Sequence, residues 1–321
     1  MTGISAPPTA RVAATAQAVR ASVASVLAGR DQAVDTALAC LLSGGHLLIE
    51  DIPGVGKTLL AQALAASVGG SFHRIQGTPD LLPGDVIGSM VPHGDGHSDG
   101  FELRFRPGPI FSNVVVFDEL NRANPRTQSA LLEATEEAAV TVDGHTRPLP
   151  DPFLLIATQN PIEMAGTYPL GEGALDRFAA VVTLGRASRA DETEVLTGRR
   201  GRAQLGAVTA VVDTTDLVAA RAAVHAVHVA DPIAHYVIDL LDATRQHPRV
   251  TLGASTRGGV AVVGLAKAVA AMDGRGYVTP ADVQAVALAG LAHRVIIAGS
   301  PLSVAREIVS ECLERVPAPA L

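Results

Sequence analysis

The residues best suited to phosphate chemistry lie between Gly54 and Thr58. Gly54 and Gly56 let the backbone turn so that successive N–H groups can face a phosphate chain. Lys57 can reach the β- and γ-phosphates of a nucleotide, and the Thr58 hydroxyl can bind Mg²⁺. The helix expected from Lys57 onward points its N-terminal dipole at the same anion. The residues predicted to contact the phosphates are Pro53, Gly54, Val55, Gly56, Lys57, Thr58 and Leu59.

This stretch departs from the full phosphate-loop pattern at one position. The pattern G-x-x-x-x-G-K-[ST] has glycine where this chain has Asp51. The core from Pro53 to Thr58 is intact, so the phosphate-binding chemistry is still expected. The alternative interpretation is a chance glycine turn that precedes a helix.

A second group of candidate residues ends the apolar run Asn113–Phe117. An unbroken run of this kind is typical of a central strand that is buried on both faces. Asp118 at its tip can hold Mg²⁺, and Glu119 can orient and deprotonate an attacking water. A carboxylate pair can also cap a helix. Together with the glycine loop, however, the pair predicts nucleotide binding and hydrolysis.

A third candidate, Asn160, follows the next apolar run, Phe153–Thr158. Its side-chain amide could contact the γ-phosphate or the attacking water. The alternative is that Asn160 only caps the loop before Pro161.

The elements that must position these residues alternate between strand and helix up to about residue 184, which indicates an α/β fold with a parallel sheet. We expect helices at 11–27, 32–42, 57–68 and 125–139, and strands at 47–49, 72–76, 113–118, 153–158 and 181–184. A turn-rich connection is expected at 78–85, and hairpins at 86–106 and 141–150.

Only helices are expected after Gly185. Ser188 with Asp191 forms a capping box for the first of them. The expected helices cover 188–197, 213–227, 231–246, 256–272, 280–297 and 302–315. The change of pattern predicts two domains, an α/β domain at 1–187 with two hairpin insertions and an all-helical domain at 188–321.

The bulk composition narrows the function classes. The chain has 321 residues, of which 48% are hydrophobic, so a folded globular protein is expected. The net charge of −7 argues against a general nucleic-acid-binding surface, although a local basic pore stays compatible with it. We see no signal peptide and no apolar run long enough to span a membrane, and we expect a cytoplasmic protein.

Two histidine groups admit a metal-site interpretation. The first is His93 and His97 with Asp95 and Asp99, for which a polar hairpin tip is the alternative. The second group lies in the helical region, where exposed or interdomain histidines are the alternative. This second group comprises His225, His228 and His235.

Many stretches along the chain together resemble the MoxR family of AAA+ ATPases, from about residue 20 to about residue 315. The stretches that carry the resemblance are Gly44–Thr58, Arg74–Gln76, Thr78–Pro83, Arg106–Phe111, Phe117–Ala123, Thr127–Ala134, Ala157–Glu163, Gly166–Leu170, Leu175–Phe178, Gly253–Arg257 and Tyr277–Pro280. The resemblance implies an α/β nucleotide-binding domain, with a parallel sheet flanked by helices, and a C-terminal helical lid. It also implies assembly into a ring, usually a hexamer.

The resemblance assigns a role to each candidate residue. It makes Lys57 and Thr58 the Walker A residues, and Asp118 and Glu119 the Walker B residues. It makes Asn160 the sensor 1 residue.

The resemblance also adds two arginines. Arg177 would be the arginine finger that reaches the ATP of the neighbouring subunit, and Arg257 would be sensor 2, which contacts the γ-phosphate in cis. Without the resemblance, each arginine would be interpreted as a surface ion pair. The chain departs from the family pattern before Arg177, where Gly171–Ala174 replaces a Pro-Glu-Ala-Gln type of segment, and these glycines are expected to loosen the placement of Arg177.

The function expected from this resemblance is Mg²⁺-dependent ATP hydrolysis that drives chaperone-like remodelling or maturation of a client protein by a homo-oligomeric ring. The resemblance further implies partners with von Willebrand factor type A domains. One alternative is a slow, ATP-gated interaction scaffold. A nucleic-acid motor is the third interpretation, and the acidic segment Gly94–Gly100 argues against it.

Overall fold

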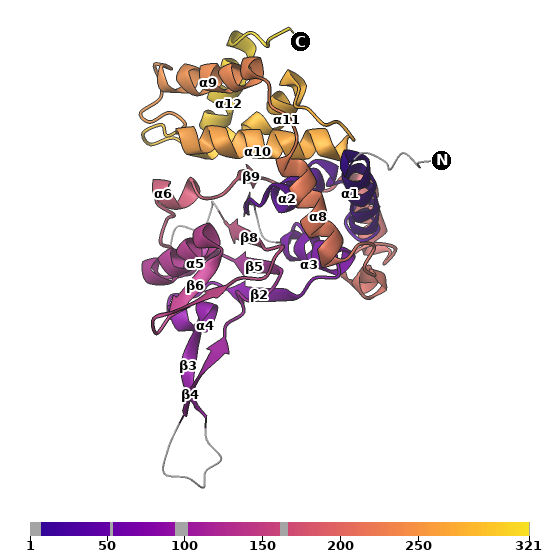
Figure 1. Ribbon diagram of the computed structural model, residues 1–321, viewed down its shortest axis with the longest axis vertical. Coiled ribbons are helices and arrows are strands. Elements are labelled where there is room, and N and C mark those ends of the chain that lie inside the picture. Colours follow the sequence, from indigo (N-terminus) through magenta and orange to yellow (C-terminus); the bar gives the residue numbers. More distant parts are fainter. Residues whose placement is uncertain (1–7, 52–53, 94–101, 161–165, 321) are drawn as a thin grey trace, which may run out of the picture.

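A five-stranded parallel sheet forms the centre of the structure, a computed structural model that describes residues 8–51, 54–93, 102–160 and 166–320 (Figure 1). The strand order is β2-β5-β8-β1-β9, and every pairing within the sheet is parallel. The strands are β1 (Leu47–Glu50), β2 (Phe72–Gln76), β5 (Val114–Asp118), β8 (Leu154–Gln159) and β9 (Ala180–Val182). The α/β fold class predicted from the sequence is confirmed.

Alternate residues of the central strands serve two different apolar cores. In β5, Val114 and Val116 belong to one core, whereas Val115 and Phe117 belong to the other. All residues of β5 are buried, as expected for a strand paired on both sides. This double burial fixes the register of β5 and therefore the position of Asp118 at its end.

Helices cover both faces of the sheet (Figure 1). The first core joins the sheet to α1 (Pro8–Ala24), α2 (Asp31–Ser43) and α3 (Lys57–Ser67). The second core joins it to α4 (Pro83–Ile87) and α5 (Pro125–Glu137). A short helix, α6 (Glu172–Leu175), precedes β9.

Two antiparallel hairpins are present, as predicted. They are β3 (Gly88–His93) with β4 (Glu102–Pro107), and β6 (Ala139–Val142) with β7 (His145–Pro148). The β3–β4 hairpin projects away from the sheet (Figure 1). Its tip, residues 94–101, lies outside the described residues.

The prediction that the first hairpin begins at Val86 is wrong, because Val86 and Ile87 belong to α4. Pro83 begins this helix, and the Asp85 carboxylate accepts a hydrogen bond from the Leu82 N–H. Gly88 then starts the strand with a φ of 93°, where a side chain would collide with the backbone of β4.

The C-terminal part is helical, as predicted. Its helices are α7 (Arg189–Leu196), α8 (Thr214–His225), α9 (Asp231–Arg245), α10 (Thr256–Met272), α11 (Pro280–Leu291) and α12 (Leu302–Arg315). Helices α9–α12 pack together at the end of the molecule opposite the β3–β4 hairpin, while α8 lies beside α1 (Figure 1). The predicted cap is present, since Ser188 Oγ accepts a hydrogen bond from the Asp191 N–H.

Two helices differ from the sequence prediction by three residues or more at an end. Helix α1 begins at Pro8, because proline suits the first turn of a helix, and it ends at Ala24. Helix α11 ends at Leu291, and Ile296 instead pairs with Leu252 as an antiparallel bridge. Among the described helices, none has the length and apolarity needed to cross a membrane.

Two buried histidines make the stability of this fold depend on pH. Burial lowers the pKa of His46 to about 4 and the pKa of His293 to about 3, from a usual value of 6.5. Below pH 6.5 the unfolded chain therefore binds protons that the folded chain does not, so the free energy of unfolding decreases as the pH falls toward 4. Each histidine should contribute a loss of about 2 kcal/mol between pH 6.5 and pH 5.

Urea unfolding at pH 7 and at pH 5 measures this loss. In the double variant His46→Gln/His293→Gln the difference between the two pH values should shrink. An unchanged difference would show that other groups cause the acid sensitivity.

Candidate active site

The carboxyl ends of β1, β5 and β8 meet at one edge of the sheet and border a cavity of about 480 Å³. Because the strands are parallel, residues that follow them in the chain converge at this edge. The described residues that line the cavity are Gly54, Gly56, Lys57, Thr58, Leu59, Gln62, Arg74, Gln76, Asp118, Glu119, Thr158, Asn160 and Arg202. Most of the candidate residues predicted from the sequence thus come together here.

The glycine loop between β1 and α3 has the geometry that the sequence predicts. Gly54 and Gly56 have φ values of 85° and 101°, which glycine adopts without strain. Apart from its chain neighbours, no atom of the described residues lies within 4 Å of the place where a Gly54 side chain would begin, so these residues leave open space for a ligand. Lys57 begins α3, and its Nζ donates to the Asp51 carbonyl oxygen at 2.7 Å. Pro53 lies outside the described residues.

Asp51, the departure from the full pattern, has a structural role. Its carboxylate accepts a hydrogen bond from the Gly185 N–H at 2.7 Å, just after β9. The side chain therefore ties the start of the loop to the neighbouring strand, where a glycine would make no such bond.

Asp118 is the focus of the polar contacts in the cavity. Its Oδ2 accepts from Thr58 Oγ1 at 3.1 Å and from Arg74 Nε at 2.5 Å, and its Oδ1 accepts from Thr158 Oγ1 at 3.3 Å. The carboxylate is 9% exposed, so a positive partner stabilises its charge. Thr58 and Asp118 present oxygen ligands to the same point, which suits Mg²⁺.

Glu119 lies one residue farther along, in an unusual backbone conformation. Its φ of 58° is rare for a residue other than glycine, and such strain is common at functional sites. The Glu119 N–H donates to Thr158 Oγ1 at 2.9 Å, which holds the backbone in place. Its Oε2 accepts from Gln76 Nε2 at 2.9 Å and from Arg122 at 3.4 Å. The side chain is 28% exposed, so water can reach the carboxylate.

Gly77 supports this conformation by leaving room for it. A side-chain carbon at Gly77 would lie 2.1 Å from the Glu119 carbonyl oxygen. We expect Gly77→Ala to cost about 1–3 kcal/mol of stability and to displace Glu119, because backbone atoms cannot yield easily. Gly276→Ala is the matched control, because Gly276 is exposed and, apart from its chain neighbours, no described atom lies within 4 Å of the added carbon.

Thermal unfolding and ATP turnover test the Gly77 prediction. Gly77→Ala should lower both the melting temperature and kcat, whereas Gly276→Ala should leave both near the wild-type values. If Gly77→Ala behaves like its control, the close approach does not constrain Glu119.

Asn160 is buried and lines the same cavity, just after β8. Sequence reasoning missed several other lining residues, of which Gln76 and Thr158 had a usable signal. Both lie at the carboxyl ends of strands that border the site. Arg202, in a 3-10 helix at Arg202–Ala207, had none.

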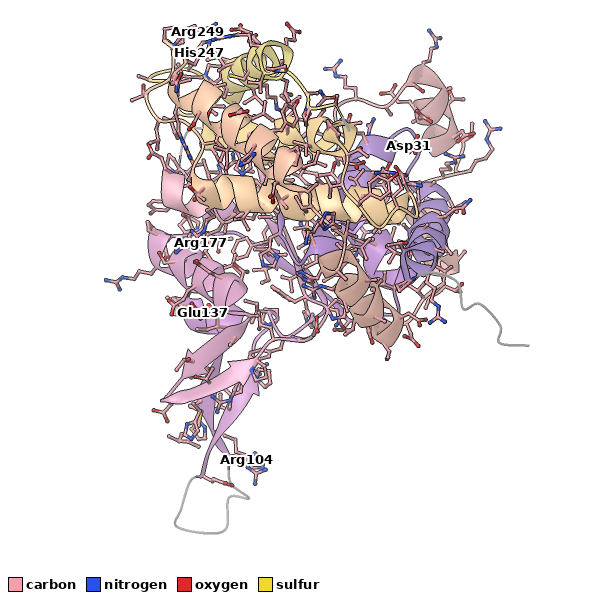
Figure 2. The ribbon with its side chains drawn as sticks, turned by 45° about the horizontal axis from the view of Figure 1, so that its top comes forward. Asp31, Arg104, Glu137, Arg177, His247 and Arg249 are labelled. Atoms are coloured by element: carbon pink, nitrogen blue, oxygen red, sulfur yellow. The ribbon has the colours of Figure 1, made fainter. Side chains whose placement is uncertain are left out.

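Arg177 and Arg257 lie elsewhere, in a second cavity of about 420 Å³. Arg177 Nε donates to Glu136 Oε2 at 2.7 Å, and Arg257 donates to Glu136 Oε1. These contacts, those of Arg177 first, lower the pKa of Glu136. Figure 2 shows Arg177 at the side of the molecule, between the C-terminal helices and the end of α5 that carries Glu137.

Neither arginine is among the described residues that line the cavity beside Lys57. Arg257 therefore does not lie beside Lys57 in this structure, and its contact with a γ-phosphate in cis stays a prediction. Arg257 lies in the first turn of α10, whose cap Ser255 donates to the Asp176 carboxylate, so the arginine lies with Arg177 instead. The two arginines thus form a unit that is separate from the protein's own glycine loop.

Metal-site interpretations of the histidines receive no support from the described ranges. Within them, no group of three or more His, Cys, Asp or Glu side chains could hold a metal ion. His225 instead lines the second cavity. His97, Asp95 and Asp99 lie outside the described residues. An Mg²⁺ ion bound with a nucleotide needs few protein ligands, so Thr58 and Asp118 are compatible with this result.

Comparison with known proteins identifies the family. Residues 46–180 match the model of the ATPase family associated with various cellular activities (AAA), and residues 242–312 match the AAA lid domain. Chaperone MoxR1 of Mycobacterium tuberculosis is 40% identical over 283 residues, which are 85% of this chain and 73% of that protein. The chain belongs to the MoxR family of AAA+ ATPases.

Two further relatives match most of the chain. The uncharacterized protein YeaC of Bacillus subtilis is 45% identical over 272 residues, covering 85% of this chain and 84% of that protein. A crystal structure of a protein from Cytophaga hutchinsonii that is provisionally named an ATPase also matches this chain. The TM-score is 0.86 and the sequence identity is 35%, and the match covers 98% of this chain and 97% of that one. Membership of the MoxR family makes this protein an ATPase with an AAA+ core and a helical lid.

Proposed function

We propose that this MoxR-family protein hydrolyses ATP in the cavity between the glycine loop and the carboxyl end of β5, with Mg²⁺ and with two arginines from a neighbouring subunit. The observation that carries the proposal is the meeting of Lys57, Thr58, Asp118 and Glu119 around one cavity. Lys57 supplies the positive charge for the phosphates, and Glu119 supplies the base.

In the proposed reaction a water molecule attacks the γ-phosphorus of ATP. The bond from the water oxygen to the γ-phosphorus forms while the bond to the β,γ-bridging oxygen breaks, which yields ADP and inorganic phosphate. Glu119 orients the water and accepts its proton. Gln76 donates to one Glu119 oxygen and so leaves the other for the water. The Asn160 amide, which lines the same cavity, would donate to the water or to the γ-phosphate.

The residues present fit a magnesium ion at the phosphates. Thr58 Oγ1 and Asp118 Oδ2 are 3.1 Å apart and would hold it together with phosphate oxygens and water. Bound there, Mg²⁺ would neutralise charge on the β- and γ-phosphates. Arg74 contacts the same Asp118 oxygen in this structure and would have to share it.

The position of Arg177 and Arg257 supports a role in trans for both. They share one carboxylate, Glu136, and lie apart from the cavity that contains Lys57. In a ring, such a face can meet the nucleotide of the next subunit, and an arginine supplied in trans stabilises the charge that develops on the transferred phosphoryl group. For Arg257 this replaces the role in cis expected from the sequence. We propose a homo-oligomeric ring, a hexamer by family resemblance.

The proposed use of this cycle is chaperone-like remodelling or maturation of a client protein in the cytoplasm. A relative at 40% identity is named a chaperone, which supports this class. Partners with von Willebrand factor type A domains stay a proposal based on the family. The division at residue 187 between nucleotide domain and lid domain also remains a proposal.

The ATP-gated scaffold remains the alternative function. Binding of a partner that needs ATP and is unaffected by Glu119→Gln would favour the scaffold. Loss of client processing with retained binding would favour the motor.

Steady-state hydrolysis with Mg²⁺ and with excess EDTA tests the proposed chemistry. We expect phosphate release with Mg²⁺, almost none with EDTA, and a similar loss in Thr58→Ala, which removes one proposed ligand of the ion. Unchanged turnover in EDTA would contradict the Mg²⁺ proposal.

A further inference from the structure

Among the arginines that form ion pairs within the described residues, Arg294 has the most deeply buried side chain. Its side chain is 2% exposed, and its Nε donates to Asp176 Oδ1 at 2.7 Å. It lies in the 3-10 helix Ala292–Arg294, which follows α11 in the helical lid. A buried charge of this kind is costly unless every donor finds an acceptor, so its partners indicate what it holds.

The partners of Arg294 lie on both sides of Arg177 in the sequence. One Nη atom donates to the carbonyl oxygens of Asp176 and Phe178, each at 2.8 Å, and the other donates to Gly290 O. The guanidinium therefore forms hydrogen bonds with the backbone of the residues immediately before and immediately after Arg177. His293 adds a further contact, since its Nε2 lies 3.1 Å from the same Phe178 oxygen.

Arg294 also contacts the beginning of α10, the helix that carries Arg257. A side-chain carbon at Gly258 would lie 2.6 Å from Arg294 Cδ, so glycine is required there for the arginine to pass. Ser255, the cap of α10, donates to the Asp176 carboxylate at 3.3 Å. One buried side chain thus touches the neighbours of both proposed trans arginines.

We infer that Arg294 is a positioning residue that couples the lid to Arg177 and Arg257, so that the lid sets the placement of both arginines toward the next subunit. The inference rests on the proposed function in trans. Arg177 Nη1 also donates to the Gly173 carbonyl oxygen at 3.2 Å, so α6 supports the arginine from its N-terminal side, contrary to the loosening expected from the glycines. Arg294 adds the contacts that tie this segment to the lid.

Arg294→Lys is the variant that tests this coupling. Lysine keeps the positive charge but lacks the planar guanidinium group, which can donate hydrogen bonds to several acceptors at once. We expect kcat to fall about 10–100-fold, since small misplacements of catalytic groups have effects of that size, while the Kd for ATP stays unchanged. Arg275→Lys is the matched control. It breaks a bidentate ion pair with Asp282, and neither residue of that pair contacts the segment around Arg177.

Mixing variants separates positioning from a general structural role. A Glu119→Gln subunit has an intact Arg294, Arg177 and Arg257 but an inactive site of its own. Mixed in equal amounts with Arg294→Lys, it should restore part of the turnover, because it supplies well-placed arginines to the intact site of the other subunit. The reference pair is Arg177→Ala mixed with Glu119→Gln.

The outcomes distinguish the inference from the proposed function. Suppose that turnover is restored in the reference pair but not in the mixture of Arg294→Lys with Glu119→Gln. That result would overturn the positioning role of Arg294 and leave the role of Arg177 in trans intact. No restoration in either pair would overturn the role in trans, and the inference with it. Wild-type kcat in Arg294→Lys would also overturn the inference. Should Arg294→Lys fail to fold, Asp176→Asn removes the carboxylate acceptor and leaves the backbone contacts, and it should lower kcat with an unchanged Kd for ATP.

Discussion

Glu119→Gln is expected to reduce ATP turnover by about 10²–10⁴-fold while ATP binding persists. The amide keeps the size of the side chain and can still bond with Gln76, but it cannot accept the proton of the attacking water. The backbone conformation of Glu119 should survive, because it depends on the bond from its N–H to Thr158. Binding contacts from Lys57 and Thr58 are unaffected.

Phosphate release and equilibrium ATP binding, measured on the same preparation, check this prediction. The matched control is Glu137→Gln at the exposed end of α5, which should behave like the wild type. Turnover above a tenth of the wild-type rate in Glu119→Gln would mean that another group acts as the base.

Arg177→Ala is expected to lower turnover by about 10³–10⁵-fold, the range observed where a trans arginine completes a phosphoryl-transfer site. The loss should appear in kcat rather than in the Kd for ATP, because Arg177 is not among the described residues that line the cavity of its own subunit. The fold should tolerate the change, since the ion pair with Glu136 is partly exposed and contributes little to stability.

Arg249→Ala is the matched control for the loss of a surface ion pair. Arg249 lies 3.9 Å from Glu311 on the lid, where Figure 2 labels it beside His247. This variant should keep wild-type turnover and melting temperature. If Arg177→Ala also keeps its turnover, Arg177 is a surface residue and the role in trans is wrong.

The sequence predicted the position of site residues correctly where a chemically suited residue lies at the end of an element with a clear hydrophobic pattern. Lys57 and Thr58 follow a glycine loop, and Asp118 ends a fully apolar strand, so local pattern was enough to place all three at one sheet edge. The same reasoning could have found Gln76, because β2 lies beside β5 in a parallel sheet. A turn-rich connection was predicted in place of helix α4, because two prolines and a glycine in this segment are typical of turns. Proline is nevertheless compatible with a first helical turn.

The second cavity could not be predicted from the sequence alone. Glu136, Arg177 and Arg257 are separated by many residues, and only the packing of α10 against the core brings them together. Arg294 gave no signal for the same reason, since its acceptors are backbone oxygens that any residue provides. Placement of this kind depends on tertiary contacts, which local propensity does not encode.

The most direct test of the central claim is the specific activity of the wild-type protein as a function of its concentration, with the mass of the assembly measured at each point. If Arg177 and Arg257 complete the site of a neighbouring subunit, the activity per subunit should rise with concentration and level off as the oligomer becomes dominant. A constant specific activity across a range in which monomers give way to oligomers would contradict the account, because each subunit would then hydrolyse ATP without its neighbour.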